Sequence, residues 1–183
     1  MTKISFCGIS GSGMSALAQI RLHQGYEVRG SDRSFDQGKD LSNKQALEKL
    51  GIKIYPQDGS AITDDLDVLY VSTAVEDTIP DVKAALGKNI PIRKRSDLLA
   101  DIFHGYGHNI AVGGTSGKTT VTAMIGYILD RLGQKPCMID GGLLLNYADR
   151  EGIPNIIYNE GDICVIEADE SDGSIEKYHP YVA

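Results

Sequence analysis

The segment "AVGGTSGKTTVTAMIGYIL", residues 111–129, places a glycine-rich turn between an apolar run and a helix-forming run. Lys118 begins the expected helix. Backbone N–H groups of such a turn bind phosphate oxygens, and a lysine at a helix N-terminus is unfavourable unless an anion pairs with it. The segment therefore predicts a nucleotide-phosphate loop, in preference to a structural turn with a lysine beside it. The common loop G-x-x-x-x-G-K-[ST] has glycine where this chain has Val112, so the spacing departs from the usual form.

Strands and helices alternate on both sides of this segment. Strands are expected at residues 3–9, 26–32, 53–55, 67–74, 109–114, 135–140 and 162–169, and helices at residues 14–24, 43–50, 80–86, 96–103 and 118–133. Such alternation predicts an α/β fold in which parallel sheets are covered by helices on both faces. The stretch "HGYGH", residues 104–108, interrupts the pattern with two glycines, so a domain boundary is expected there. Residues 1–104 would then form a Rossmann-like parallel-sheet domain, and residues 105–183 would belong to a P-loop α/β domain.

Composition excludes several classes of protein. The net charge of −7 and the pI near 5.0 argue against nucleic acid or a membrane surface as the main partner. The basic run at residues 93–95 is interpreted as a solvated loop after a strand. No apolar run approaches the roughly 20 residues that span a bilayer, and no signal-peptide pattern is present at the N-terminus. Cys7, Cys137 and Cys164 lie in apolar runs without a C-x-x-C pair, which predicts buried free thiols in a reducing, cytoplasmic compartment.

A second glycine-rich turn lies near the start of the chain, in "CGISGSGMSALA", residues 7–18. It contains G-x-G-x-x-A at Gly11, Gly13 and Ala16, after a strand and before a helix. Glycines allow the backbone to approach a diphosphate, and the helix N-terminus offers N–H groups and partial positive charge. Asp32 ends the next expected strand, where an acidic residue would contact a ribose hydroxyl. The combination favours nucleotide binding over a tight structural turn, although the motif alone is weak.

Acidic residues are concentrated in "ICVIEADESDGS", residues 163–174. Glu167, Asp169, Glu170 and Asp172 repel one another unless cations or solvent separate them. A hard divalent ion shared with nucleotide phosphates would relieve this repulsion, whereas the alternative is an exposed acidic turn. The carboxyl ends of parallel strands face the ligand crevice, and the turn at Gly113 leaves from the same edge, so the metal interpretation is preferred.

Together these motifs resemble those of the Mur ligase family, over essentially the whole chain. The matching stretches are "FCGISGSGMSALA" at 6–18, "GSD" at 30–32, "VSTAV" at 71–75, "GTSGKTT" at 114–120, "GGL" at 141–143 and "EADESD" at 167–172. They are most similar to the members that add L-alanine to UDP-N-acetylmuramate. The family's phosphate loop is the shorter form G-T-x-G-K-[ST]-[ST], so valine at position 112 is expected.

The resemblance implies an ATP-dependent acid–amino-acid ligase of peptidoglycan biosynthesis, with ATP and Mg²⁺ as cofactors. Its first domain would bind the UDP part of UDP-N-acetylmuramate, and its second would bind ATP and convert the substrate carboxylate to an acyl phosphate, which the amine of an amino acid then attacks. The residues carried over for UDP-substrate binding are Gly8, Ser10, Gly11, Ser12, Gly13, Met14, Ser31, Asp32, Ser72, Thr73 and Ala74. Those for ATP are Gly114, Thr115, Ser116, Gly117, Lys118, Thr119 and Thr120, with Lys118 and Glu167 catalytic and Thr119 and Glu167 as metal ligands.

Some features depart from the family pattern. Ser116 stands where the nearest members usually have histidine, and Asp140 where asparagine is more usual. The added amino acid therefore stays open, with D-glutamate-adding, tripeptide-recycling and folate-extending relatives as alternatives. The chain ends in "HPYVA", part-way into what resembles the next core strand, so an N-terminal fragment that does not ligate alone is expected. Two other classes stay open: a dinucleotide-dependent oxidoreductase that uses the first glycine turn, and a non-catalytic UDP-sugar-binding module.

Overall fold

The computed structural model describes residues 1–72, 76, 78–168 and 174–183. The chain divides into two compact units, Met1–Arg95 with Arg150–Ile153 (unit 1) and Ser96–Asp149 with Pro154–Ala183 (unit 2). The division assigns the helix before "HGYGH" to unit 2, whereas the sequence pattern assigned it to the first domain. The 1–104 and 105–183 domains stay a prediction.

Unit 1 is built on a five-stranded parallel sheet in the order β3-β2-β1-β4-β5. Its elements are β1 (Lys3–Cys7), α1 (Ser12–His23), β2 (Glu27–Ser31), α2 (Arg33–Asp36), α3 (Leu41–Leu50), β3 (Lys53–Tyr55), β4 (Val68–Val71), α4 (Pro80–Gly87) and β5 (Ile92–Lys94). The chain proceeds outward from β1 to β2 and β3, and then returns to the other side of β1 for β4 and β5. The strand order therefore reverses between β1 and β4, and ligands of open α/β sheets bind at the carboxyl ends of the strands beside such a point.

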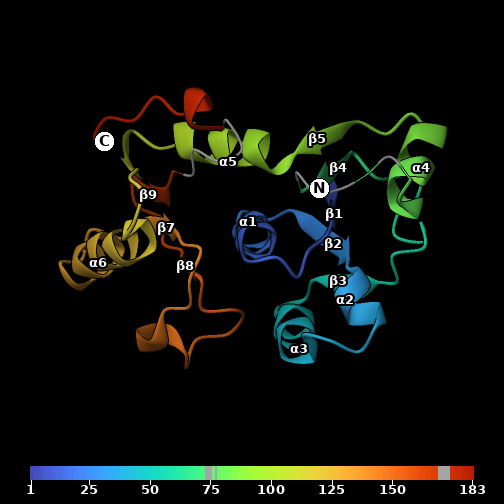
Figure 1. Ribbon diagram of the computed structural model, residues 1–183, viewed down its shortest axis with the longest axis horizontal. Helices are drawn as coiled ribbons and strands as arrows, with labels where there is room; N and C mark the ends of the chain where they lie inside the picture. The colour runs from blue at the N-terminus through green and yellow to red at the C-terminus, as the bar shows by residue number, and fades with distance from the viewer. Residues whose placement is uncertain (73–75, 77, 169–173) are drawn as a thin grey trace. The chain divides into compact units, whose positions relative to one another are not determined.

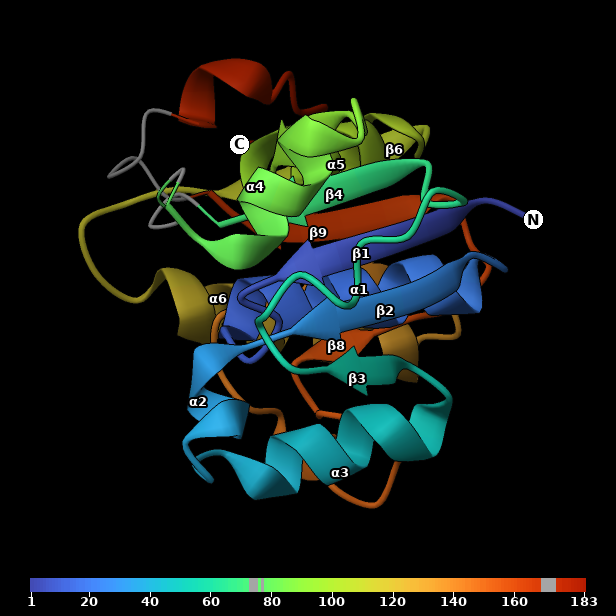
Figure 2. The ribbon, with the colours of Figure 1, turned by 90° about the vertical axis from the view of Figure 1, so that its right-hand side faces the viewer.

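Apolar packing on both faces holds this sheet. Helix α1 and helix α4 lie on opposite sides of it (Figure 1 and Figure 2). On one side α1 buries an unbroken run from Met14 to Ile20. On the other side lies a cluster that joins the sheet to α4 and the loop before β4, formed by Cys7, Ala61, Ile62, Leu66, Leu69, Val82, Ala85 and Ile90. The α/β sheet with helices on both faces, expected from the alternation, is confirmed for this unit.

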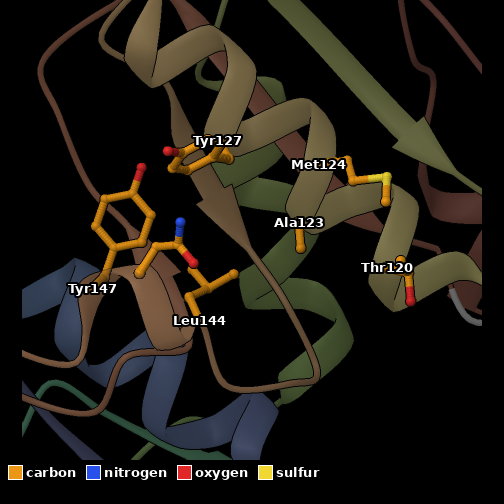
Figure 3. A pocket seen from close by; sticks show the side chains of 7 residues that line it. Thr120, Ala123, Met124, Tyr127, Leu144 and Tyr147 are labelled. Atoms are coloured by element: carbon orange, nitrogen blue, oxygen red, sulfur yellow. The ribbon is translucent and has the colours of Figure 1, made fainter.

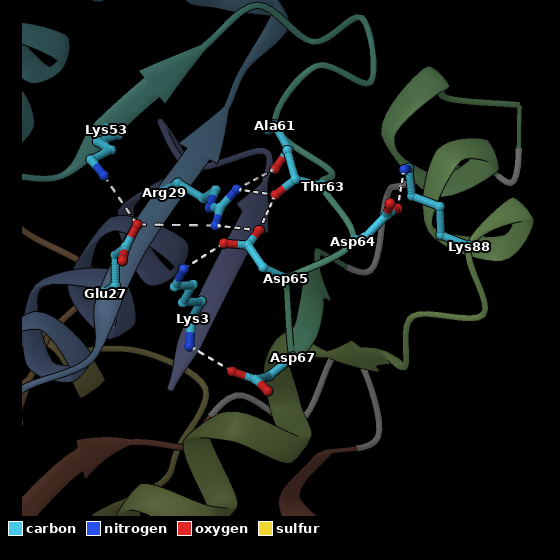
Figure 4. Close-up of polar contacts among 10 residues, drawn as sticks. All are labelled: Lys3, Glu27, Arg29, Lys53, Ala61, Thr63, Asp64, Asp65, Asp67 and Lys88. Atoms are coloured by element: carbon cyan, nitrogen blue, oxygen red, sulfur yellow. Dashed lines mark hydrogen bonds and ion pairs between the residues drawn. The ribbon is translucent and has the colours of Figure 1, made fainter. Parts of the chain in front are cut away.

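Ion pairs gather at the amino edge of the unit 1 sheet (Figure 4). Lys53 Nζ donates to Glu27 Oε1 over 3.0 Å, which joins the starts of β3 and β2. Arg29 is 4% exposed, and its Nη1 donates to the Thr63 hydroxyl over 2.6 Å and to the Ala61 carbonyl over 3.2 Å. These contacts fasten the loop before β4 to the sheet. The charged side chains at this edge therefore form contacts that stabilise the fold.

Unit 2 is built on a four-stranded sheet in the order β6-β9-β7-β8. Its elements are α5 (Arg95–His104, whose first residue belongs to unit 1), β6 (His108–Val112), α6 (Lys118–Arg131), β7 (Cys137–Ile139), η1 (Leu145–Tyr147), β8 (Ile156–Ile157), β9 (Ile163–Glu167) and η2 (Ser174–Lys177). Helix α6 packs closely on β7, because a Cβ added at Gly126 would lie 2.6 Å from Met138 Cγ. The core beneath it contains Met138, Leu144, Tyr147, Ile157 and Val165.

The expectation of parallel pairing was wrong for β8, which runs antiparallel to β7. Parallel neighbours are usually joined by a crossover helix, whereas the connection from Ile139 to Ile156 contains the short 3₁₀ turn η1 and no α-helix. Two short elements, β5 and α2, were also not expected. The basic run at 93–95 falls in β5 and at the start of α5, so the solvated-loop interpretation was wrong.

The three cysteines are buried and unpaired, as expected. Burial and the nearby negative charge of Asp81 raise the pKa of Cys7 to about 12, so this thiol stays protonated near neutral pH. Among the described residues, no helix combines the length and the apolar character that crossing a bilayer requires.

Candidate functional site

The first candidate site is a cleft of about 440 Å³ in unit 1, at the carboxyl edge of the sheet. Four strands deliver residues to it: Gly8 follows β1, Asp32 follows β2, Ser72 follows β4 and Arg95 follows β5. The full lining is Gly8, Ser10, Gly11, Ser12, Gly13, Met14, Asp32, Ser72 and Arg95. The structure therefore brings together the predicted UDP-binding residues except Ser31, Thr73 and Ala74. Thr73 and Ala74 lie outside the described residues.

The glycine turn is held by backbone contacts that its sequence permits. Gly8 has a φ of +86°, a conformation that side chains disfavour, and its N–H donates to the Ser31 carbonyl over 2.9 Å. The N–H of Ile9 donates to the same carbonyl over 3.1 Å. Gly11 is the N-cap of α1, and the first N–H groups of a helix have no acceptor within the helix. These contacts fix the turn against the end of β2, and the N-terminus of α1 adjoins the cleft.

Asp32 has a structural task in this site. Its Oδ2 accepts the Ser10 N–H over 2.8 Å, while its Oδ1 accepts both the N–H and the hydroxyl of Ser34, each over 2.8 Å. A carboxylate has about four acceptor positions, so most of its capacity is used inside the protein. Asp32 therefore caps α2 and fixes the glycine turn, and the predicted contact with a ribose stays a prediction.

Ser31 does not line the cleft, although the sequence placed it there. Its hydroxyl donates to Asp81 Oδ2, and both side chains are buried. The Gly59 N–H donates to Asp81 Oδ1 over 2.8 Å, and burial raises the pKa of this carboxyl above its usual value. The Ser31 carbonyl therefore accepts hydrogen bonds from the glycine turn, and its hydroxyl is bonded to a buried carboxylate away from the cleft.

Arg95 is the lining residue that sequence reasoning missed. A Cβ added at Gly13 would lie 2.9 Å from Arg95 Nη1, so the guanidinium lies over the first turn of α1. The signal that could have found it is its position directly after a strand, which places it at the carboxyl edge. That strand, β5, is three residues long and contains two charged residues, Arg93 and Lys94, so its pattern did not identify it.

The second candidate site is the glycine-rich loop between β6 and α6 in unit 2. Gly114 and Gly117 have φ values of +134° and +78°, and Gly117 is the N-cap of α6. A Cβ added at Gly113 or Gly117 would meet nothing within 4 Å. Lys118 Nζ folds back and donates to the Gly114 carbonyl over 2.8 Å. The loop is therefore open on one side, with an ammonium group beside its backbone.

Thr119 and Glu167, the two metal ligands that the resemblance implies, contact each other at this loop. Thr119 Oγ1 lies 3.0 Å from each carboxylate oxygen of Glu167. The sheet sets this contact, because Val112 at the end of β6 pairs with Glu167 at the end of β9. The Ala168 N–H then donates to the Val112 carbonyl over 2.9 Å. A hydroxyl and a carboxylate are the hard oxygen ligands that Mg²⁺ prefers.

The paired glycines after β7, Gly141 and Gly142, pack against Glu167 and Thr119. A Cβ at Gly141 would lie 3.0 Å from Glu167 Oε2, and one at Gly142 would lie 2.9 Å from Thr119 Cγ2. Asp140 is buried, and its Oδ1 accepts the Gly142 N–H over 3.3 Å. Burial raises the pKa of Asp140, and the negative charge of Glu167 adds to the effect. Asp140 thus holds a turn that only glycines allow to approach Thr119 and Glu167.

The other predicted ATP residues divide into two groups. Thr115 and Ser116 are exposed in the loop. Thr120 lines a separate pocket of about 240 Å³ along α6 (Figure 3). The remainder of this pocket is Ala123, Met124, Tyr127, Leu144, Asn146 and Tyr147. Thr119, not Thr120, therefore supplies the hydroxyl beside Glu167.

The described residues do not by themselves complete a metal site. Asp169, Glu170 and Asp172 lie outside the described residues, and within the described part no group of three or more His, Cys, Asp or Glu side chains could hold a metal ion. Mg²⁺ usually keeps several waters and binds one or two protein ligands together with substrate phosphates. Thr119 and Glu167 fit that smaller role.

A family model for "Mur ligase family, catalytic domain" matches residues 3–106, which is more than half of the chain. The chain belongs to the Mur ligase family. Among Mur ligases it is 38% identical, over 180 residues, to the UDP-N-acetylmuramate–L-alanine ligase of Caulobacter vibrioides, with 98% of this chain and 36% of that protein covered. The chain thus spans about a third of the length of the curated Mur ligases that it matches.

Solved Mur ligase structures share the fold. The UDP-N-acetylmuramate-alanine ligase of Thermotoga maritima superposes with a TM-score of 0.86 at 31% identity, covering 98% of this chain and 40% of that one. The UDP-N-acetylmuramate:L-alanyl-gamma-D-glutamyl-meso-diaminopimelate ligase of Neisseria meningitides gives a TM-score of 0.77 at 29% identity, covering 94% and 54%. The α/β fold class expected from the sequence is confirmed.

Proposed function

We propose that this chain is the UDP-substrate-binding domain and the first part of the ATP-binding domain of a ligase that adds an amino acid to UDP-N-acetylmuramate in peptidoglycan biosynthesis. The observation that carries the proposal is the contact of Thr119 with Glu167 beside Lys118 and an open glycine loop. A structural turn has no need of a lysine, a hydroxyl and a carboxylate at one point. ATP with Mg²⁺ would use all three, the lysine for phosphate and the two oxygen ligands for the metal ion.

The residues of unit 2 would have separate roles in binding the nucleotide and in phosphoryl transfer. The backbone N–H groups of residues 114–119 would surround phosphate oxygens, and Lys118 would leave the Gly114 carbonyl to stabilise charge on the transferring phosphoryl group. Thr119 and Glu167 would hold Mg²⁺, which when bound neutralises phosphate charge during transfer to the substrate carboxylate. The glycines at 141 and 142 keep both ligands in place. The amine of the amino acid then displaces the phosphate.

Unit 1 would bind the UDP moiety in its cleft, with the diphosphate at the glycine turn. The Caulobacter and Thermotoga relatives act on UDP-N-acetylmuramate and alanine by name, so L-alanine is the amino acid we propose. The Neisseria relative supports a second candidate, a ligase that attaches a tripeptide to the same UDP-sugar. Both candidates place UDP-N-acetylmuramate in unit 1, so the proposal for that cleft is independent of the choice.

The test has a binding part and an activity part. Isothermal titration of the 183-residue chain with UDP-N-acetylmuramate should show saturable binding, and UDP should compete for it. NAD(H), followed by its fluorescence, should not bind. Because the chain spans about a third of its relatives' length, we expect no ATP-dependent ligation of L-alanine or of the tripeptide by this chain alone. NAD(H) binding without UDP binding would favour an oxidoreductase, and steady product formation would overturn the expectation of inactivity.

A further inference from the structure

The cleft of unit 1 has an unusual balance of charge for a diphosphate site. A nucleoside diphosphate is strongly anionic, and the glycines and serines of the turn supply neutral donors. Of the described residues that line the cleft, Asp32 is acidic and Arg95 is basic. Asp32 is already bonded to Ser10 and Ser34, so its negative charge stays beside the turn. The charge of Asp32 would repel a bound diphosphate, and Arg95, which lines the same cleft, is placed to offset that repulsion.

Arg95 reaches the turn from a distant part of the chain. It follows β5, at the edge of the sheet beyond β4, while the turn follows β1. A Cβ added at Gly13 would lie 2.9 Å from Arg95 Nη1, 3.4 Å from its Cδ and 3.7 Å from its Cζ. The absence of a side chain at position 13 therefore allows the guanidinium to approach the N-terminus of α1. Two sources of positive potential, the helix end and the guanidinium, converge at one place.

We propose that Arg95 binds the diphosphate of the UDP-linked substrate, opposite the N-terminal turn of α1. The inference rests on the proposed function, which places UDP in this cleft, and deepens it by naming the charged contact. The guanidinium presents paired N–H donors that match phosphate oxygens, whereas a lysine would act as a single point of charge. The site should therefore distinguish UDP from UMP and from uridine, because the contact is made to the diphosphate and not to the base.

The experiment compares UDP, UMP and uridine by isothermal titration into the 183-residue chain and into the Arg95→Gln variant. Losing a charge-assisted contact should weaken UDP binding about 10- to 100-fold and leave uridine binding unchanged. The matched control is Arg93→Gln, which removes the same charge from an exposed position on β5, two residues before Arg95. It should bind UDP like the wild type.

The outcomes separate the inference from the proposed function. If the wild-type chain binds no UDP, the proposed function of unit 1 fails. If the wild type binds UDP and Arg95→Gln binds it as tightly as Arg93→Gln does, the proposed function stands and the role of Arg95 is overturned. An equal loss of uridine affinity would also overturn it. Should circular dichroism show Arg95→Gln to be unfolded, Arg95→Lys replaces it. That variant keeps the charge and should still bind UDP more weakly, and wild-type affinity would contradict the paired contact.

Discussion

In the functions we propose, both glycine-rich turns bind phosphate groups, and they take their cations from different parts of the chain. In unit 2 the cation, Lys118, is adjacent to its loop in sequence, and the loop's second partner, Glu167, ends the neighbouring strand. In unit 1 the turn at residues 8–13 has no basic residue of its own, and Arg95 comes from a strand two positions away in the sheet. A phosphate site whose cation is adjacent to its loop in the chain can be predicted from the sequence. A site whose cation is brought in by another strand of the sheet cannot.

The largest effect should come from the turn that has its own cation. In a ligase that contains this segment at the full length of its relatives, Lys118→Ala should lower kcat by about 10²–10³, or roughly 3–4 kcal/mol, because a group that stabilises the transferring phosphoryl group is lost. Affinity for the UDP-substrate should be unchanged. Glu167→Ala should instead raise the Mg²⁺ concentration for half-maximal rate. Steady-state kinetics over a Mg²⁺ series measures both, and near-normal kcat and Mg²⁺ dependence in the two variants would make the loop structural.

A smaller effect should come from the glycines that support this loop. In Gly142→Ala the new Cβ would lie 2.9 Å from Thr119 Cγ2, so overpacking should lower the free energy of unfolding by about 1–3 kcal/mol. Gly113→Ala adds the same methyl group where nothing lies within 4 Å, and should stay within about 0.5 kcal/mol of the wild type. Urea denaturation of the chain compares them. Equal free energies of unfolding for the two variants would show that the turn at residues 141–142 can accommodate a methyl group without loss of stability.

The smallest effect concerns the acidic residue of unit 1. Asp32→Ala removes the cap of α2 and the acceptor for the Ser10 N–H, so the free energy of unfolding should fall by about 1–2 kcal/mol. Asp36 is an exposed carboxylate in the same short helix that accepts one hydrogen bond, from the Gln57 N–H over 2.9 Å, so Asp36→Ala shows the effect of losing the charge and a single bond. If Asp32→Ala weakened UDP binding without any loss of stability in urea, the ribose contact expected from the sequence would be favoured over the structural task.

Local patterns predicted much of the fold and of the phosphate loop. Thr119 and Glu167 could be anticipated from the resemblance to the Mur ligase family, and the acidic segment was expected beside the loop because the ends of parallel strands share one edge. Arg95 could not, because β5 is too short and too charged to show a period. Asp32 was assigned to a ligand because sequence cannot show that Ser10 and Ser34 already use its oxygens. The antiparallel β8 was missed because two residues give no pattern.

The central claim is that the two units hold separate phosphate sites. Isothermal titration of UDP-N-acetylmuramate into the 183-residue chain and two variants tests it directly. In Gly13→Val the new side chain would occupy the space between α1 and Arg95, so binding should be abolished. In Lys118→Ala binding should match that of the wild type. Equal loss of UDP-substrate binding in the two variants, with circular dichroism showing both folded, would contradict the account and indicate a single shared site.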